Sequence, residues 1–211
     1  MYKHKQVYES LDYIFIQMEQ MDGGSLSSLL HRKGKLNEAE AITVMKGVLE
    51  GLQYIHLNGY IHRDIKPENI LLAKENDLST VHIADFGLGA KLEAWFGQNK
   101  NKLCGTMIYM APEQATSDNY SQNVDTWACG MMLYILLTGK HPLYNIESDT
   151  KLTYLEKLKD PQWKFPSSFG DLAKKLFLKC CTTNNVNRYD IINALQHPWI
   201  TRYPIKQKSK R

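Results

Sequence analysis

One stretch of the chain is apolar on nearly all sides of a helix, and it limits what the rest can fold into. The stretch runs from Val124 to Thr138 and stops at Gly139, a residue typical of helix ends. A helix that is apolar all round must be surrounded by protein or by lipid. Its longest unbroken apolar run, 127–137, has 11 residues, whereas about 20 are needed to span a bilayer. We therefore expect a buried central helix within one core, for which 211 residues are sufficient.

The remaining patterns predict a mainly helical unit with a small β part at its front. No repeat or Gly/Ser linker divides the sequence, so we treat it as one continuous folding unit. Ser25 can cap a short helix, and Asn37 with Glu40 forms the pattern of a capping box for a long helix that stops at Asn58-Gly59. The other expected elements are two strands within residues 6–20 around a Ser-Leu-Asp turn, short strands at 70–72 and 81–84, and helices near 149–159, 171–181 and 190–196.

Charge and cysteine content exclude several classes of protein. The net charge of +4 is too mild to indicate nucleic-acid binding. Residues 204–211 form a basic tail, interpreted as a solvated end, with a partner or membrane contact as the alternative. The four cysteines contain no C-x-x-C pair, which favours reduced structural thiols. Because no apolar segment follows the first residues, we expect no secretory signal and a cytoplasmic protein without nucleic-acid or membrane partners.

Three short motifs stand in a fixed order. They are His62-Arg63-Asp64-Ile65-Lys66-Pro67-Glu68-Asn69, then Asp85-Phe86-Gly87, then Ala111-Pro112-Glu113. Three such matches in order are not an accident, and they resemble the eukaryotic protein kinase family. The ending His197-Pro198-Trp199-Ile200 is similar to that of calcium/calmodulin-dependent-type kinases.

The resemblance implies an α+β, protein kinase-like fold. Its mainly α-helical large lobe would follow two N-terminal strands of a truncated small lobe. We expect residues 1–21 to be the remnant of the small lobe and the hinge, 22–203 to be the large lobe, and 204–211 to be the basic tail.

The resemblance also implies phosphoryl transfer from ATP, with Mg²⁺, to a serine or threonine of a protein substrate. Asp64 matches the catalytic base, and Lys66 matches the lysine that meets the transferring phosphate in serine/threonine kinases. Asn69 and Asp85 match the magnesium ligands, and their oxygens are the ligand type that Mg²⁺ prefers. Gly105-Thr106 resembles the substrate-docking segment of the serine/threonine class.

For the adenine ring, the resemblance places a hinge at Glu19-Gln20-Met21. This hinge would lie behind Met18, and Leu71 would lie beneath the ring. Ser25 falls where many relatives have an acidic residue that touches the ribose or a basic substrate. We count Met18, Glu19, Met21, Ser25 and Leu71, with Asn69 and Asp85, as nucleotide-binding candidates.

Other matched residues imply support rather than chemistry. We expect His62 and Phe86 to be packing side chains and Gly87 to be a backbone hinge. Glu113 would form a structural ion pair with Arg188. Asp125, in Asp-x-Trp-x-x-Gly, would anchor the backbone of the catalytic loop.

The chain departs from the family pattern at its front. It contains no Gly-x-Gly-x-x-Gly loop, no strand lysine in a Val-Ala-x-Lys pattern and no helix glutamate to pair with it. We therefore expect feeble activity from the chain alone. Two strands without a sheet are marginal in water, so residues 6–20 should fray or bind a partner chain.

A second departure lies between the second and third motifs. Residues 88–104 contain no Ser, Thr or Tyr, so no activating phosphosite is available there. Arg63, which grips such a phosphate in relatives, would need a fixed acid in its place, and Glu93 is the candidate. Two functional hypotheses stay open: a serine/threonine kinase, and a non-catalytic kinase-like interaction or scaffold protein within a larger assembly.

Overall fold

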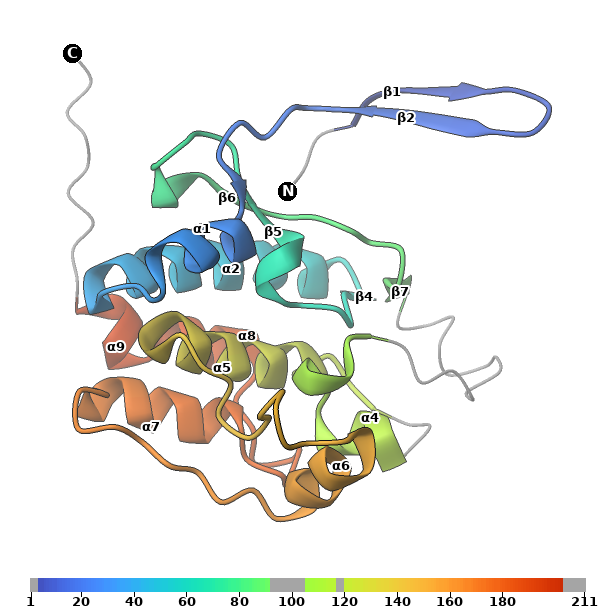
Figure 1. The fold of residues 1–211 in the computed structure, drawn as a ribbon. Coiled ribbons are helices and arrows are strands. Elements are labelled where there is room, and N and C mark those ends of the chain that lie inside the picture. Colours follow the sequence, from blue (N-terminus) through green and yellow to red (C-terminus); the bar gives the residue numbers. More distant parts are fainter. Residues whose placement is uncertain (1–3, 92–104, 117–119, 203–211) are drawn as a thin grey trace.

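Helix α5 (Asn123–Thr138) runs through the middle of the computed structural model, which describes residues 4–91, 105–116 and 120–202 (Figure 1). Most of its side chains are buried, and it packs between α2 (Glu38–Leu57) and α7 (Asp171–Cys180). It ends at Gly139, whose φ of 72° is in the left-handed region that favours glycine. The expected buried central helix is confirmed.

The helices next to the site begin at the predicted caps. Ser25 accepts a hydrogen bond from the backbone N–H of Ser28 and begins α1 (Leu26–Lys33). Asn37 and Glu40 exchange both bonds of a capping box at the start of α2, and Asn58 is the C-cap that follows its last residue. These local signals were sufficient because each cap satisfies its own helix end.

The second half of the chain is helical, as expected. The additional helices are α4 (Pro112–Thr116), α6 (Lys151–Lys159), α8 (Ile191–Gln196) and α9 (Pro198–Thr201). Helices α4 and α9 were not predicted. In α9 the buried Trp199 donates its indole N–H to Glu38 Oε1 at 2.8 Å, which ties the last helix to the start of α2.

In the described part of the chain, three small antiparallel sheets complete the fold. Strands β1 (His4–Glu9) and β2 (Ile14–Met18) form a hairpin, as predicted, with Tyr8 opposite Phe15 and Val7 opposite Ile16. Strands β3 (Gly24–Ser25), β5 (Ile70–Leu72) and β6 (Val81–Ile83) form a second sheet in that order. Strands β4 (Tyr60–Ile61) and β7 (Ala90–Lys91) form the third. The observed mixture of a helical body and a small β part agrees with the expected α+β class.

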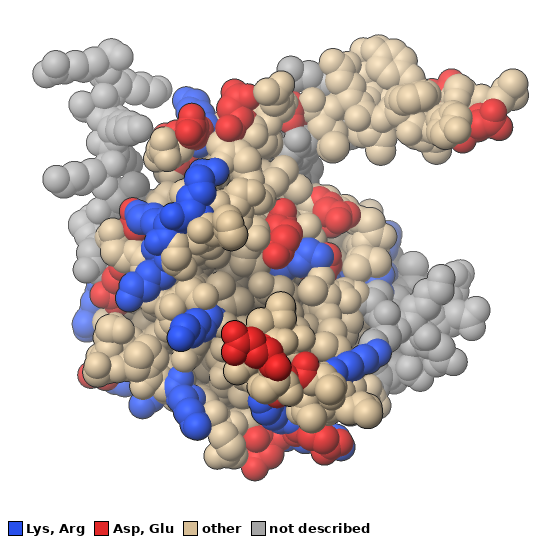
Figure 2. Space-filling view, viewed as in Figure 1, with Lys and Arg blue, Asp and Glu red and all other residues tan. Residues whose placement is uncertain are grey.

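The β1–β2 hairpin projects from the body (Figure 1). Figure 2 shows that most of its surface carries no charge. Its apolar side chains, Val7, Tyr8, Leu11, Tyr13, Ile14, Phe15, Ile16 and Met18, are all at least half exposed. The hairpin is therefore an apolar surface that no other described part of the chain buries.

The described cysteines are reduced and structural, as expected. Cys129, Cys180 and Cys181 are buried free thiols, and burial raises the pKa of each of them. Gly130 lets α7 approach α5 closely, because a Cβ there would lie 2.3 Å from Cys181 Sγ. Cys104 lies outside the described residues.

The expected division of the chain into a remnant of the small lobe, a large lobe and a tail is not tested by the structure. The boundaries after residues 21 and 203 stay predictions, and the tail 204–211 lies outside the described residues. Among the helices that the structure describes, none combines the length and the apolar character needed to cross a membrane.

Candidate active site

The loop that carries the first motif connects β4 to β5, and Asp125 of α5 holds its backbone. The carboxylate accepts the backbone N–H of His62 at 2.9 Å through Oδ2 and that of Arg63 at 2.8 Å through Oδ1. Arg63 has a φ of 70°, a conformation that costs a non-glycine residue free energy and persists when neighbours impose it. The expected anchoring role of Asp125 is confirmed.

Asp125 is 1% exposed and has a third partner. His56 Nε2 lies 2.8 Å from Asp125 Oδ2. Burial alone would raise the pKa of Asp125, but the hydrogen bond and charge of His56, with the contacts of His62, outweigh it and lower the pKa. Asp125 is therefore held as a carboxylate.

His62 is a packing residue, as predicted. It is fully buried, its Nε2 lies 3.1 Å from the Ala84 carbonyl oxygen, and its ring contacts Phe86 at 5.0 Å between centroids. Phe86 makes that contact but is 43% exposed, so its predicted role as a packing side chain is correct only for one side of the ring. The hinge role of Gly87 stays a prediction.

Asp64 lies at the centre of a hydrogen-bonded cluster. Its Oδ1 accepts the backbone N–H of Thr106 at 2.9 Å and the Thr106 hydroxyl at 2.8 Å. Its Oδ2 accepts Asn69 Nδ2 at 2.9 Å and lies 2.7 Å from Lys66 Nζ. Lys66 Nζ also donates to Thr106 Oγ1 at 2.6 Å. The structure therefore brings together three of the predicted residues, Asp64, Lys66 and Asn69.

Thr106 is the contact that sequence reasoning missed. Gly105-Thr106 resembles a substrate-docking segment, and neither this resemblance nor the local sequence indicates a bond to a residue 42 positions earlier. Gly105 makes the approach possible, because a Cβ there would lie 2.6 Å from the Arg63 carbonyl oxygen. The glycine directly before the threonine was the available signal.

The ionisation of Asp64 follows from these contacts. Burial alone would raise its pKa, but the hydrogen bonds from Lys66 and Thr106, with the Lys66 charge, outweigh burial and lower the pKa. Asp64 is therefore a carboxylate at neutral pH, flanked by one cation. A side chain of this kind can accept and orient a hydroxyl group.

A cavity of about 790 Å³ lies beside this cluster, beneath the hairpin. Four predicted residues line it: Met18, Leu71, Asn69 and Asp85. The other lining residues are Val7, Ile16, Glu68, Ala84, Phe86 and Gly87. The volume falls within the range of small-molecule sites, which are mostly apolar with a few placed polar groups.

Three predicted nucleotide-binding residues do not line this cavity. Ser25 caps α1, and Met21 accepts the backbone N–H of Gly24 through its carbonyl oxygen. Glu19 lies in the connection between β2 and β3. Their contact with a nucleotide stays a prediction.

The oxygens of Asn69 and Asp85 fit a hard cation. Asn69 directs Nδ2 toward Asp64, so its Oδ1 has no hydrogen bond within the described residues. Asp85 has a φ of 61°, and its Oδ1 accepts the backbone N–H of Gly87 at 3.1 Å. The described residues contain no cluster of three or more His, Cys, Asp or Glu side chains that could hold a metal by themselves. A donor set of this size matches Mg²⁺, which is usually held by one or two carboxylates together with phosphates and water.

The predicted ion pair between Glu113 and Arg188 is present. The Arg188 side chain is fully buried and meets both carboxylate oxygens of Glu113, with Nη2 to Oε2 at 2.9 Å. It also donates to the carbonyl oxygens of Asn123 and Thr182 and lies over the Trp127 ring. The pair connects α4, next to the site, to the segment between α7 and α8.

The predicted partner of Arg63 cannot be placed, because Glu93 lies outside the described residues. Arg63 Nε donates to the carbonyl oxygen of Leu88. This contact holds the start of the segment between the second and third motifs against the loop that carries the first motif.

Comparisons with known proteins agree with this geometry. The protein kinase domain matches residues 2–200. A probable myosin light chain kinase of Dictyostelium discoideum is 33% identical over 209 residues, covering 94% of this chain and 52% of the relative. The delta subunit of calcium/calmodulin-dependent protein kinase type II of the rabbit, Oryctolagus cuniculus, is 37% identical over 195 residues, covering 89% of this chain and 35% of the relative. The chain thus spans about half the length of one relative and about a third of the other, and the similarity expected from His197–Ile200 is confirmed.

Proposed function

The chain belongs to the protein kinase family, and from this premise we propose that it transfers the γ-phosphoryl group of ATP to a serine or threonine hydroxyl of a protein substrate. The observation that carries the proposal is the cluster in which Lys66 and Thr106 both contact the Asp64 carboxylate. Phosphoryl transfer requires alignment and charge neutralisation more than covalent help from the protein. A carboxylate and a cation at one point beside a cavity provide both.

Asp64 would accept the hydroxyl proton of the substrate. Its lowered pKa makes it a weak base, so its larger contribution is to orient the hydroxyl toward the phosphate. Each of its oxygens already accepts two hydrogen bonds, which fills the roughly four acceptor positions of a carboxylate. The substrate hydroxyl must therefore replace one donor, and the side chain of Thr106 can rotate away.

Lys66 would neutralise charge on the transferred group. Its ammonium bridges Asp64 and Thr106, and its side chain is 19% exposed. A compact, partly desolvated cation interacts with developing negative charge more strongly than a fully hydrated one.

The cavity would hold the nucleotide. Met18 and Leu71 provide apolar contact for the adenine ring, with Glu19, Met21 and Ser25 proposed near the hinge and the ribose. Asn69 and Asp85 would hold Mg²⁺, which when bound neutralises phosphate charge. Asn69 has a second task, because its amide orients Asp64.

We further propose that the chain alone reacts slowly. The sequence lacks the glycine-rich loop and the strand lysine that relatives use to grip the phosphates. By analogy with the loss of one preorganised charge-stabilising donor, the absence of that lysine should cost about 100- to 1000-fold in rate.

The test is phosphate transfer from radiolabelled ATP to a generic serine/threonine substrate. We expect slow incorporation that Asp64→Asn abolishes and Lys66→Gln lowers by about 100-fold or more. Lys74→Gln, at an exposed position after β5, is the matched control and should leave the rate unchanged. Incorporation that persists in Asp64→Asn would contradict the proposal, and an ordinary kinase turnover of the wild type would contradict the slow rate.

A second function is favoured by one observation, the exposed apolar hairpin β1–β2. A non-catalytic kinase-like protein in a larger assembly would bury this surface against a partner chain. Thermal unfolding with Mg²⁺ and ATP separates the two functions. A ligand that binds the native state raises Tm, so a clear increase favours the kinase, and an unchanged Tm at millimolar ATP favours the scaffold.

A further inference from the structure

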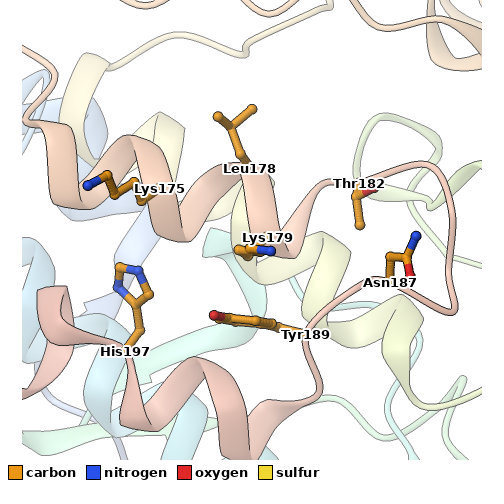
Figure 3. Close-up of a pocket in the computed structure, with 7 residues that line it drawn as sticks. All are labelled: Lys175, Leu178, Lys179, Thr182, Asn187, Tyr189 and His197. Carbon is orange, nitrogen blue, oxygen red and sulfur yellow. The ribbon is translucent and has the colours of Figure 1, made fainter.

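A second pocket, of about 460 Å³, lies between α7 and the segment that leads through α8 to α9 (Figure 3). Figure 1 shows α7 on the other side of α5 from the hairpin. In Figure 3, Lys175 lies above His197, Lys179 lies above the Tyr189 ring, and Thr182 and Asn187 close the other end. Leu178 completes the lining. Among these lining residues there is no carboxylate, and every side chain except leucine carries a hydrogen-bond donor.

Two cations stand one turn apart on α7. Lys175 and Lys179 are both exposed, and neither forms an ion pair with a carboxylate within the described residues. Lys179 Nζ lies 5.7 Å from the centroid of the Tyr189 ring, which directs its ammonium over the pocket. The two positive charges are therefore available to an anion.

His197 adds a neutral donor whose tautomer is fixed by the fold. Its Nδ1 accepts the backbone N–H of Trp199 at the start of α9, so the ring proton must be on Nε2. His197 is 8% exposed, and its Nε2 makes no hydrogen bond within the described residues. Burial, with the nearby charge of Lys175, lowers the pKa of His197 and keeps the ring neutral at pH 7.

The carboxylates nearest in sequence are engaged or lie at a helix end. Asp190 caps α8, and its Oδ1 accepts both the backbone N–H and the side-chain amide of Asn193. Asp171 stands in the first turn of α7 and does not line the pocket. Arg188 is occupied by Glu113.

We propose that this pocket binds a phosphomonoester group, such as a phosphorylated serine or threonine side chain. The group carries nearly two negative charges and three acceptor oxygens near pH 7. The two negative charges of the group match the two lysines of the pocket. Its three oxygens can accept hydrogen bonds from the neutral donors of His197, Tyr189 and Thr182. A carboxylate, with one charge and two oxygens, would leave one lysine uncompensated. The site is separate from the Asp64 cluster and does not depend on the proposed kinase activity.

Binding of a labelled peptide, Ala-Ala-phosphoserine-Ala-Ala, tests the proposal by fluorescence anisotropy without nucleotide or Mg²⁺. The unphosphorylated peptide and a peptide with aspartate at the central position should bind about tenfold more weakly or worse. Lys175→Gln and Lys179→Gln should each weaken binding of the phosphopeptide about tenfold or more, because each removes a charged hydrogen bond. His197→Asn should also weaken it, since asparagine can still cap α9 but lacks Nε2.

Two control variants locate the site. Lys174 is on the same helix, but its ammonium lies over the Phe165 ring and the residue does not line the pocket. Lys174→Gln should therefore bind the phosphopeptide with the affinity of the wild type. Lys66→Gln should also bind normally, which separates this pocket from the active site. Loss of binding in Lys66→Gln with retention in Lys175→Gln and Lys179→Gln would overturn the proposal, as would equal affinity for the phosphorylated and unphosphorylated peptides.

Inorganic phosphate, used as a competitor, distinguishes the source of the group. Displacement at concentrations near the Kd of the peptide assigns a free phosphate compound as the ligand. A requirement for about tenfold more inorganic phosphate, or a larger excess, assigns a phosphorylated protein. Both results keep the phosphomonoester site, and no displacement at any concentration would overturn it.

Discussion

Replacing Asp125 by asparagine should both destabilise the protein and disturb its catalytic loop. The carboxylate meets three donors, which are the backbone N–H groups of His62 and Arg63 and the ring of His56. Asparagine keeps the shape but replaces one oxygen with an NH₂ group. Whichever way the amide turns, that NH₂ faces at least one N–H group, and a donor then stands opposite a donor in the protein interior.

The size of the loss follows from these contacts. A hydrogen bond to a charged group contributes about 1.5–3 kcal/mol, and a buried donor left without an acceptor costs a further 1–3 kcal/mol or so. With its oxygen in the place of Oδ2, the introduced asparagine would keep the bonds from His62 and His56 as weaker, neutral ones and would lose the bond from Arg63. We therefore expect Asp125→Asn to lower the free energy of unfolding by about 3–5 kcal/mol. Arg63 contributes to this loss, because its φ of 70° costs free energy that the hydrogen bond to the carboxylate no longer offsets.

Urea unfolding of wild type and variant measures this difference. Asp160→Asn, at an exposed position after α6, is the matched control and should change the free energy of unfolding by less than about 0.5 kcal/mol. Hydrogen exchange gives a second readout, because the amides of His62 and Arg63 should exchange faster in Asp125→Asn. A loss below about 1 kcal/mol with unchanged exchange would refute the reasoning that the carboxylate anchors the loop.

The pH dependence of this difference has a definite sign. The pKa of Asp125 is lower in the folded protein than its ordinary value of 3.8. Its ionisation therefore stabilises the fold fully above that ordinary value and loses this effect as the pH falls through the folded pKa. The stability gap between wild type and Asp125→Asn should be constant near neutral pH and should narrow in strong acid.

Three further predictions concern other parts of the molecule. Glu113→Gln should lower the free energy of unfolding by about 3–5 kcal/mol in urea, because the buried Arg188 guanidinium loses its carboxylate; a loss below about 1 kcal/mol would contradict this. Burial lowers the pKa of His141 to about 4, so the unfolded chain binds a proton at a higher pH than the folded protein does. Acidification from about pH 7 to about pH 4 should therefore lower the free energy of unfolding by up to about 3 kcal/mol. Thermal unfolding of His141→Asn should show a smaller acid loss. Phe15, 57% exposed on the hairpin, should promote association, so Phe15→Lys should reduce light scattering at high concentration with little change in Tm.

The sequence predicted the long helices well because their signals are local. The caps at Ser25 and Asn37 satisfy donors within three residues of themselves, so no distant contact is needed to recognise them. The all-apolar stretch of α5 likewise requires burial whatever surrounds it. Helices α4 and α9 have five and four residues, too few for a periodic pattern, and they form because neighbouring elements hold them.

The sheets were harder to predict for a related reason. Strand β3 has two residues, Gly24 and Ser25, and exists because β5 lies beside it. Gly23 permits this contact, since a Cβ there would lie 2.5 Å from Leu72 Cβ. No periodic pattern marks a strand of two residues, so the contact between Gly23-Gly24 and β5 has no local signal in the sequence.

The candidate site shows the same division between local and distant contacts. The resemblance singled out Asp64, Lys66 and Asn69, and the structure places Lys66 and Asn69 around the Asp64 carboxylate. A short loop with its ends held in β4 and β5 keeps these three residues close together. Met21 and Ser25 were assigned by the same resemblance, and neither lines the cavity. The Met21 carbonyl oxygen accepts the backbone N–H of Gly24, and the Ser25 side chain caps α1.

Thr106 explains how the site depends on a distant segment. Its hydroxyl accepts from Lys66 and donates to Asp64, so one group with both capacities fixes the cation and the carboxylate relative to each other. A serine could make the same bonds, whereas alanine or valine could not. Two segments outside the loop therefore determine its geometry. Asp125 of α5 binds the loop backbone, and Thr106, in the segment that precedes α4, binds the side chains of Asp64 and Lys66. A movement of that segment would change the position of the Asp64 side chain without changing the fold of the loop.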